Sequence, residues 1–351
     1  INTNDAAGNT VAITGTTIDF NNVTIDTDNT NNDGNVTLTH NTSQDTVTID
    51  AGGGIAQITP VTTSAVIEVA NTNSGTISED VFYDIDTFDI TAANALIGDA
   101  SHTGNIFIGN TLAAITFTSA SNVQVRNSSS GQIILGSDYS SAGGFLTLTS
   151  GNGVTLQDSS SNNTATINLG AGALTVTGAV TLADNTIDIT ANGGISFSST
   201  IDADNAGSND RALTMNAGTG GAIAVTGNIG GGSGLAGLTI TQSNGATFSG
   251  NVNVNDVNGG GGTITITDTE NGADIVFAGS VVAKALDLAQ QGYDLIFNGG
   301  ATFTDAVTFD NTGILTLGNA SGDTFTFNGG LTETTSGNVT LASTINSSND
   351  A

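Results

Sequence analysis

The chain has 351 residues and a formal net charge of −29, from 3 Lys and Arg against 32 Asp and Glu. It contains 48 Gly, 1 Pro and no Cys, and 37% of its residues are hydrophobic. This composition excludes disulfide bonds, lacks the basic surface that nucleic acids require, repels anionic membranes and offers no apolar run of membrane-spanning length.

Strands rather than helices are expected throughout. Only four Glu and three Lys or Arg occur, so an amphipathic helix has little from which to build its polar face. Val, Ile, Thr and Phe are abundant, and these residues suit a pleated sheet. Many Gly, Ser and Asn are also typical of disorder, but the hydrophobic fraction and the regular alternation argue against it.

Residues 1–105 contain short period-2 segments separated by Asn and Gly, which predict strands. The clearest segments are Val11–Ile13, Ile18–Phe20, Val23–Ile25, Val36–Leu38 and Val47–Ile49. The span 60–98 has the sole Pro and the densest aromatic residues. We interpret 1–105 as less regular coils, with an irregular coil or a protruding insertion near 60–98.

From about Ile106 the strands fall into recurring families with two apolar positions each. The first family comprises Leu146/Leu148, Ile167/Leu169, Ile187/Ile189, Leu213/Met215, Leu238/Ile240, Ile264/Ile266, Leu286/Leu288, Leu315/Leu317 and Val339/Leu341. The second comprises Val154/Leu156, Leu174/Val176, Ile195/Phe197, Ile223/Val225, Ala246/Phe248, Ile275/Phe277, Leu295/Phe297 and Phe325/Phe327. A third, weaker family comprises Val180/Leu182, Val252/Val254, Val281/Ala283 and Val307/Phe309.

The spacing of these families predicts a solenoid. Successive members of the first family begin 20 to 29 positions apart, and up to three short strands fall within each step. A β-sandwich is the competing fold, but it requires no fixed strand phase, whereas this phase runs from Leu146 to Leu341. We therefore predict an all-β parallel β-helix, with three short strands per coil and regular repeats over 106–351.

The two ends of the sequence resemble each other. The chain begins Ile1-Asn-Thr-Asn-Asp-Ala6 and ends Ile345-Asn-Ser-Ser-Asn-Asp-Ala351. Neither end shows a cap, and exposed solenoid ends are normally capped. We expect the repeats to continue past the C-terminus, into adjoining segments of a longer chain or into another copy stacked head to tail. Chance repetition of Asn- and Asp-rich strings is the alternative.

The run from Arg211 to Gly221, and on to Gly250, resembles the repeats of large secreted bacterial adhesins of the filamentous haemagglutinin-like type. The shared features are Ala-Leu-Thr, Leu-Thr-Ile and Phe-x-Gly segments, over roughly Ile106 to the C-terminus. The resemblance implies a right-handed parallel β-helix shaft exported to the cell surface or medium. The secretion domain of that family is not recognisable in residues 1–100.

No catalytic constellation is evident, so we do not expect an enzyme. His40 and His102 are the only imidazoles, no Cys is present, and the cations Arg126, Arg211 and Lys284 are far apart in the repeat. A catalytic triad or a zinc site is therefore unsupported.

Calcium is the one cofactor that the sequence suggests. Asp26, Asp28, Asn31 and Asp33 place oxygen ligands before Gly34, and a loop that starts at Asn29 partly matches the opening of a calcium loop. The twelfth position of such a loop would be His40 instead of Glu. The alternative is an Asn/Asp turn in which these side chains cap their own backbone.

Phe82, Tyr83 and Phe88 are candidates for an exposed binding patch, although aromatic residues more often serve burial. We predict a structural, extracellular, cell-surface protein, the β-helical shaft of a filament or giant adhesin that associates with itself. The alternative is an adhesin module that binds a surface glycan or a partner protein through 60–98.

Overall fold

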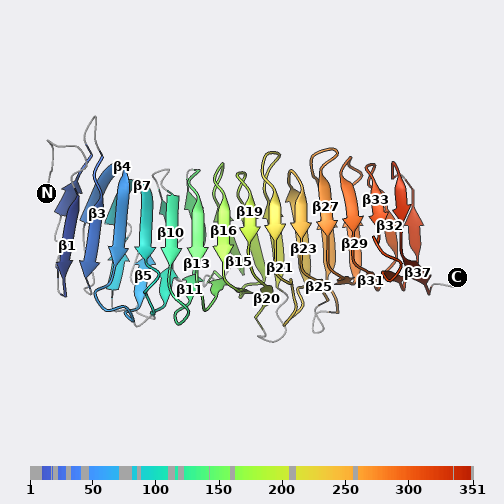
Figure 1. Ribbon diagram of the computed structural model, residues 1–351, viewed down its shortest axis with the longest axis horizontal. Coiled ribbons are helices and arrows are strands. Elements are labelled where there is room, and N and C mark those ends of the chain that lie inside the picture. The colour runs from blue at the N-terminus through green and yellow to red at the C-terminus, as the bar shows by residue number, and fades with distance from the viewer. Residues whose placement is uncertain are drawn as a thin grey trace. The chain divides into compact units, whose positions relative to one another are not determined.

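A computed structural model of the chain describes residues 10–16, 18, 23–28, 33–40, 47–70, 81–84, 88–109, 115–117, 122–141, 143–158, 163–204, 211–255, 260–334 and 336–348. These residues form strands and turns, without a helix among them. The chain divides into two compact units, 1–179 and 180–351. We call them the N-terminal and C-terminal units and describe each by itself. Figure 1 labels the strands.

In the N-terminal unit the strands form three sheets, which we call faces 1, 2 and 3. Face 1 contains β9 (Ile115–Phe117), β12 (Tyr139–Ser141) and β15 (Thr164–Asn168). Face 2 contains β1 (Val11–Gly15), β2 (Val23–Asp26), β3 (Val36–His40), β4 (Val47–Thr59), β7 (Phe88–Gly98), β10 (Asn122–Arg126), β13 (Leu146–Thr149) and β16 (Leu174–Thr177). Face 3 contains β5 (Ile67–Ala70), β6 (Val81–Asp84), β8 (Ile106–Ile108), β11 (Ile133–Leu135) and β14 (Val154–Leu156).

In the C-terminal unit the chain visits three corresponding faces in turn. Face 1 contains β18 (Thr186–Thr190), β21 (Ala212–Asn216), β23 (Gly237–Gln242), β26 (Thr263–Ile266) and β29 (Ala285–Leu288), followed by the separate pair β32 (Val307–Phe309) and β35 (Leu331–Glu333). Face 2 contains β19 (Ile195–Phe197), β22 (Ile223–Val225), β24 (Ala246–Phe248), β27 (Asp274–Phe277), β30 (Asp294–Phe297), β33 (Leu315–Leu317) and β36 (Val339–Leu341). Face 3 contains β17 (Val180–Leu182), β20 (Ile201–Ala203), β25 (Val252–Val254), β28 (Val281–Ala283), β31 (Ala301–Phe303), β34 (Thr324–Phe327) and β37 (Thr344–Ser347).

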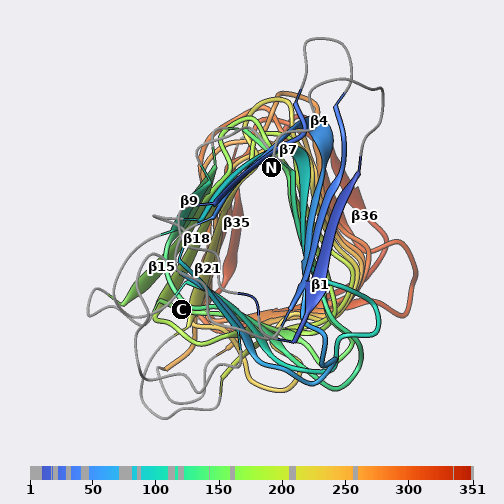
Figure 2. The same ribbon diagram turned by 90° about the vertical axis from the view of Figure 1, so that its left-hand side faces the viewer.

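The strands pair in parallel, each with its counterpart in the next coil. On face 2 of the C-terminal unit, Ile195 pairs with Ile223, and Leu315 pairs with Val339. Pairing partners on this face lie between 20 (295 − 275) and 29 (275 − 246) positions apart. The predicted parallel β-helix, with coils of 20 to 29 residues, is confirmed. Figure 2 shows strands of successive coils overlying one another within each unit.

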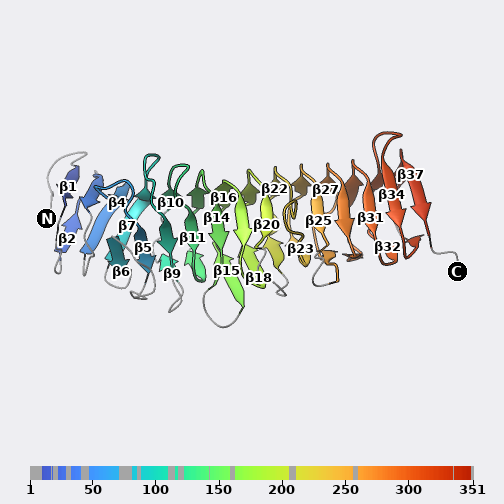
Figure 3. The ribbon, with the colours of Figure 1, turned by 90° about the horizontal axis from the view of Figure 1, so that it is seen from below.

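One coil of the N-terminal unit is longer than the rest. Ala56 of β4 pairs with Ala95 of β7, 39 positions (95 − 56) along the chain. This coil carries β5 and β6, which pair with each other, and β5 also pairs with β8. Figure 3 shows these face 3 strands from below. Residues 71–80 and 85–87 of this coil are outside the described residues.

Period-2 alternation produces these strands because one side chain in two can be buried. In β13, for example, Leu146 and Leu148 are fully buried while Thr147 and Thr149 are half-buried. Parallel pairing then places like residues over like along the interior, so Leu146 aligns with Leu174. The interior of each unit is thus built from rows of Leu, Ile, Val and Phe, whose burial is the main stabilising term.

The assignment of strands to the three sequence families is wrong at both ends of the regular repeat. Leu146 pairs with Leu174 on face 2, whereas Ile167 pairs with Tyr139 on face 1. Leu146/Leu148 therefore belongs to the second family, and Val154/Leu156, which pairs with β11 on face 3, belongs to the third.

A similar error occurs after Leu286. Leu315 pairs with Leu295 on face 2, and Val339 follows Leu315 there. Phe325 pairs with Ala301 on face 3. The strand Ala301–Phe303, which no sequence family included, shifts all later assignments by one face. Since any strand with two apolar positions fits any face, spacing alone could not distinguish the faces.

The Phe-x-Gly motif has a packing cause. Phe248 stacks on Phe277 and Phe277 on Phe297, with ring centroids 5.0 Å apart in both pairs. The glycines two residues later also stack, and a methyl group on Gly279 would lie 2.6 Å from the carbonyl oxygen of Gly250. The motif therefore marks a corner where consecutive backbones touch.

Candidate functional site

Two of the predicted calcium residues, Asp28 and Asp33, converge beside face 2 of the N-terminal unit. A methyl group on Gly52 would lie 2.8 Å from Oδ1 of both Asp28 and Asp33, so these carboxyl groups converge above this glycine. Gly52 has a φ of +51°, a conformation that favours glycine. Asn31, the remaining member of the predicted set, is outside the described residues.

The same turn recurs in the next coil. Asp26 pairs in register with Asp50, and each carboxylate accepts a hydrogen bond from the backbone N–H two residues later. These bonds are 3.1 Å long to Asp28 and 3.2 Å long to Gly52. The sequence left open whether these Asp side chains bind calcium or cap their own backbone. Asp26 caps the backbone of its own turn.

The carboxyl groups repel one another. The pKa of Asp28 is raised above 3.8, first by its hydrogen bond with Asp33, then by desolvation and by the charges of Asp50, Asp33 and Asp26. Such a cluster of oxygens suits a hard cation. Across the described parts of the chain, however, no three or more His, Asp or Glu side chains are arranged to hold a metal ion.

The predicted aromatic patch is placed only by its backbone. Phe82 and Tyr83 belong to β6, and Phe88 begins β7. Their side chains are outside the described residues, so neither the exposed nor the packed interpretation is decided. Binding through 60–98 therefore stays a prediction.

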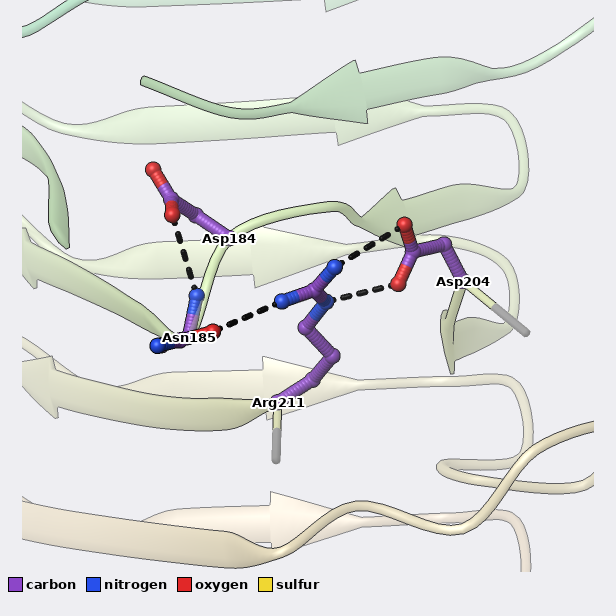
Figure 4. Close-up of polar contacts among 4 residues, drawn as sticks. All are labelled: Asp184, Asn185, Asp204 and Arg211. Carbon is purple, nitrogen blue, oxygen red and sulfur yellow. Dashed lines mark hydrogen bonds and ion pairs between the residues drawn. The ribbon is translucent and has the colours of Figure 1, made fainter. Parts of the chain in front are cut away.

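Arg211 is engaged in a structural clamp in the C-terminal unit (Figure 4). Its Nε and Nη2 donate to the two carboxylate oxygens of Asp204, at 2.6 and 3.1 Å, and its Nη1 donates to Oδ1 of Asn185 at 2.9 Å. Arg211 is 6% exposed and Asp204 is 25% exposed. Bidentate geometry makes such a pair strong, and it joins the two ends of segment 205–210.

Both histidines are buried. His40 is 0% exposed and His102 is 1% exposed. The ring nitrogens of His102 make no hydrogen bond of good geometry among the described residues, although the backbone of Asn105 lies close enough to favour the charged ring. Burial lowers the pKa of His102 below 6.5, and the charge of Asp99 opposes this shift only in part.

A groove on face 2 of the N-terminal unit was not predicted. It has a volume of about 160 Å³ and is lined by Gln57, Leu96, Asp99, Gln124 and Arg126 among others. Alternation in Val123-Gln-Val-Arg126 indicates that Gln124 and Arg126 face outward. The pairing that places Leu96 between the two glutamines has no signal in the sequence, because these strands lie in different coils.

The chain was compared with protein-family models, curated proteins and solved structures. Nothing matches in any of the three comparisons. The resemblance to adhesin repeats therefore depends on the residues quoted above. Among the described residues, no helix is sufficiently long and apolar to cross a membrane.

The coil formed by β35, β36 and β37 has an apolar face without cover. Val339, Leu341 and Ile345 are 44%, 57% and 36% exposed. They align with buried residues of the preceding coil, namely Leu315, Leu317 and Phe325, which are at most 2% exposed. The inward-facing side chains of this coil are therefore apolar and exposed. Its strands also have one edge that pairs with no other strand among the described residues.

Proposed function

We propose that this chain is a structural extracellular protein, a β-helical shaft segment of a bacterial surface filament or giant adhesin. It associates with itself by stacking coil on coil. The observation that carries the proposal is the in-register parallel stacking of coil on coil, in which Ile195 pairs with Ile223 and Leu315 pairs with Val339. Surface localisation is supported by the resemblance to adhesin repeats.

The shaft works mechanically. Within each unit the hydrogen-bond ladders join one coil to the next, as from Ile195 to the carbonyl of Ala222 at 2.9 Å. The interior adds stacked aromatic rings, and full burial of one Phe stabilises by about 1.5 to 3 kcal/mol. Because each coil contacts only its neighbours, stability is nearly a sum of such terms.

Stacking continues the same geometry. A coil laid on β36 would pair its backbone with an open strand edge and cover Leu341 as β36 covers Leu317. The covering coil belongs to an adjoining segment of a longer chain or to a second copy. Exposed edges with apolar side chains otherwise favour uncontrolled aggregation.

The test is negative-stain microscopy with sedimentation velocity of the purified 351-residue chain over a range of concentrations. We expect particles that lengthen by end-to-end contact as concentration rises. Leu341→Asp places a charge in the apolar end face and should return the protein to monomers. Phe145→Asp is the matched control, because Phe145 is 51% exposed and belongs to the N-terminal unit rather than to the coil of β36.

Monodisperse single-length particles at all concentrations, or equal effects of the two substitutions, would contradict stacking of copies. The intact mass of native material then separates the two forms of the proposal. A mass far above 34.7 kDa for one chain indicates adjoining segments of a longer polypeptide.

A further inference from the structure

We propose that the groove on face 2 of the N-terminal unit binds a neutral sugar ring of a glycan. The groove lies over β4, β7 and β10, and its volume is about 160 Å³. Drug-sized ligands occupy pockets of about 300 to 1,000 Å³, so this groove holds one ring of a longer chain. The inference does not depend on the shaft proposal.

The floor of the groove is apolar and its sides are amides. Leu96 of β7 is half-buried and faces outward between two polar neighbours. Parallel pairing places Gln57 of β4 beside it on one side and Gln124 of β10 on the other. The carbon face of a sugar ring can pack on Leu96 while its hydroxyls reach either amide.

The amides suit hydroxyl groups because both partners donate and accept. Each glutamine side chain offers two N–H donors and one carbonyl acceptor, and each hydroxyl offers one donor and two lone pairs. A carboxylate or a phosphate ligand would use only the donors.

A positive and a negative side chain complete the lining. Arg126 is exposed, and no ion pair to its guanidinium is present among the described residues. The Asp99 carboxylate accepts from the N–H and Oγ of Ser101 at 2.7 and 2.6 Å. A carboxylate has about four acceptor positions, so Asp99 can accept a further hydroxyl.

These charges favour a neutral ligand over an anionic one. Arg126 and Asp99 bring charges of opposite sign to the groove, and the formal net charge of the chain is −29. A polyanion therefore meets overall repulsion, which a neutral glycan does not. The guanidinium can donate two parallel hydrogen bonds to neighbouring hydroxyls of one ring.

The test is a set of NMR titrations with homo-trisaccharides of glucose, galactose and mannose, and with tri-galacturonate as the anionic probe. We expect at least one neutral trisaccharide to bind with a millimolar Kd. The side-chain amide resonances of Gln57 and Gln124 should shift during that titration. The Kd should change little with added NaCl, because no net charge is neutralised.

Two substitutions test the lining. Gln124→Ala and Arg126→Gln should each weaken binding about 3- to 10-fold, as expected for the loss of one or two hydrogen bonds. Lys284→Gln is the matched control, since it removes the same charge in the C-terminal unit, outside the groove, and should leave Kd unchanged. Circular dichroism verifies that each variant folds. If a variant does not fold, the shifts of the Gln57 and Gln124 amides in the parent chain still test the site.

The proposal is overturned if no neutral trisaccharide shifts the Gln57 and Gln124 amides, or if Gln124→Ala and Arg126→Gln behave like Lys284→Gln. It is also overturned if tri-galacturonate binds more tightly than every neutral probe and loses that affinity in Arg126→Gln, which would define an anion site. Leu341→Asp should bind the sugar normally, so failure of stacking and failure of sugar binding are distinguishable.

Discussion

Arg211 is one of three cationic side chains in the sequence, and it is buried against two partners from the preceding coil. Asn185 precedes face 1 of one coil, and Asp204 follows face 3 of the same coil. Arg211 itself begins the next coil. One side chain therefore joins two coils, which sequence spacing did not suggest.

Arg211→Met should destabilise the C-terminal unit by about 2 to 3 kcal/mol, because it leaves Asp204 and Asn185 without their partner in a largely buried place. The partial exposure of Asp204 keeps the cost below that of a fully buried pair. Urea unfolding measures the change. Lys284→Met is the control, and a loss equal to that of Arg211→Met would show that the clamp adds no stability.

His102 predicts a dependence of stability on pH. Because burial holds its folded pKa below the 6.5 of the unfolded chain, folding favours the neutral ring. Its contribution is complete above pH about 6.5 and is lost as the pH falls from there towards the folded pKa. The free energy of unfolding should therefore decrease on acidification below neutral pH.

His102→Gln should flatten that part of the pH profile, whatever its effect on absolute stability. Chemical denaturation at a series of pH values provides the comparison. An unchanged slope in the variant would assign the acid sensitivity to other groups, with His40 the next to test.

At the scale of the element, the Phe and Gly columns decide how coils stack. Phe248, Phe277 and Phe297 form one column, and the following strand on that face continues with Leu317, which pairs with Phe297. Phe327 instead lies on face 3, where it stacks on Phe303 with centroids 5.8 Å apart. The motif is thus a property of a corner, and the chain uses it on more than one face.

Gly279→Ala should destabilise the C-terminal unit by about 1 to 3 kcal/mol, since the new methyl group meets backbone of the preceding coil that cannot move aside. Gly322→Ala is the matched control, because no atom lies within 4 Å of its Cβ position, and it should change stability little. Thermal unfolding of the two variants checks the difference. Similar melting temperatures would mean that the corner adjusts more easily than its packing indicates.

At the scale of the molecule, the net charge of −29 makes stability depend on ions. NaCl should raise the melting temperature by screening, since the Debye length falls from about 30 Å at 0.01 M to about 10 Å at 0.1 M. If the predicted residues Asp26, Asp28, Asn31 and Asp33 hold Ca²⁺, CaCl₂ at matched ionic strength should raise the melting temperature further. Asp28 adds a dependence on pH, because its raised folded pKa gives stability that is complete below 3.8 and is lost as the pH rises through the folded value.

Asp28→Asn separates the two effects. It should keep the response to NaCl and lose the extra response to CaCl₂, and in chelator it should be at least as stable as the parent, because one repelling charge is gone. Equal melting temperatures in NaCl and CaCl₂ for the parent chain would rule out a structural calcium site at these residues.

The sequence by itself determined the fold class and the coil length, because alternation, glycine corners and a step of 20 to 29 residues are local properties of the chain. Only the tertiary structure decided which strand lies on which face. Ala301–Phe303 has a weak apolar pattern, yet its pairing with β28 shifts the faces of the strands after it. The groove at Leu96 and the clamp at Arg211 were hidden for the same reason. Both join residues of different coils, and such neighbours are set by loop lengths and pairing register rather than by any pattern within one strand.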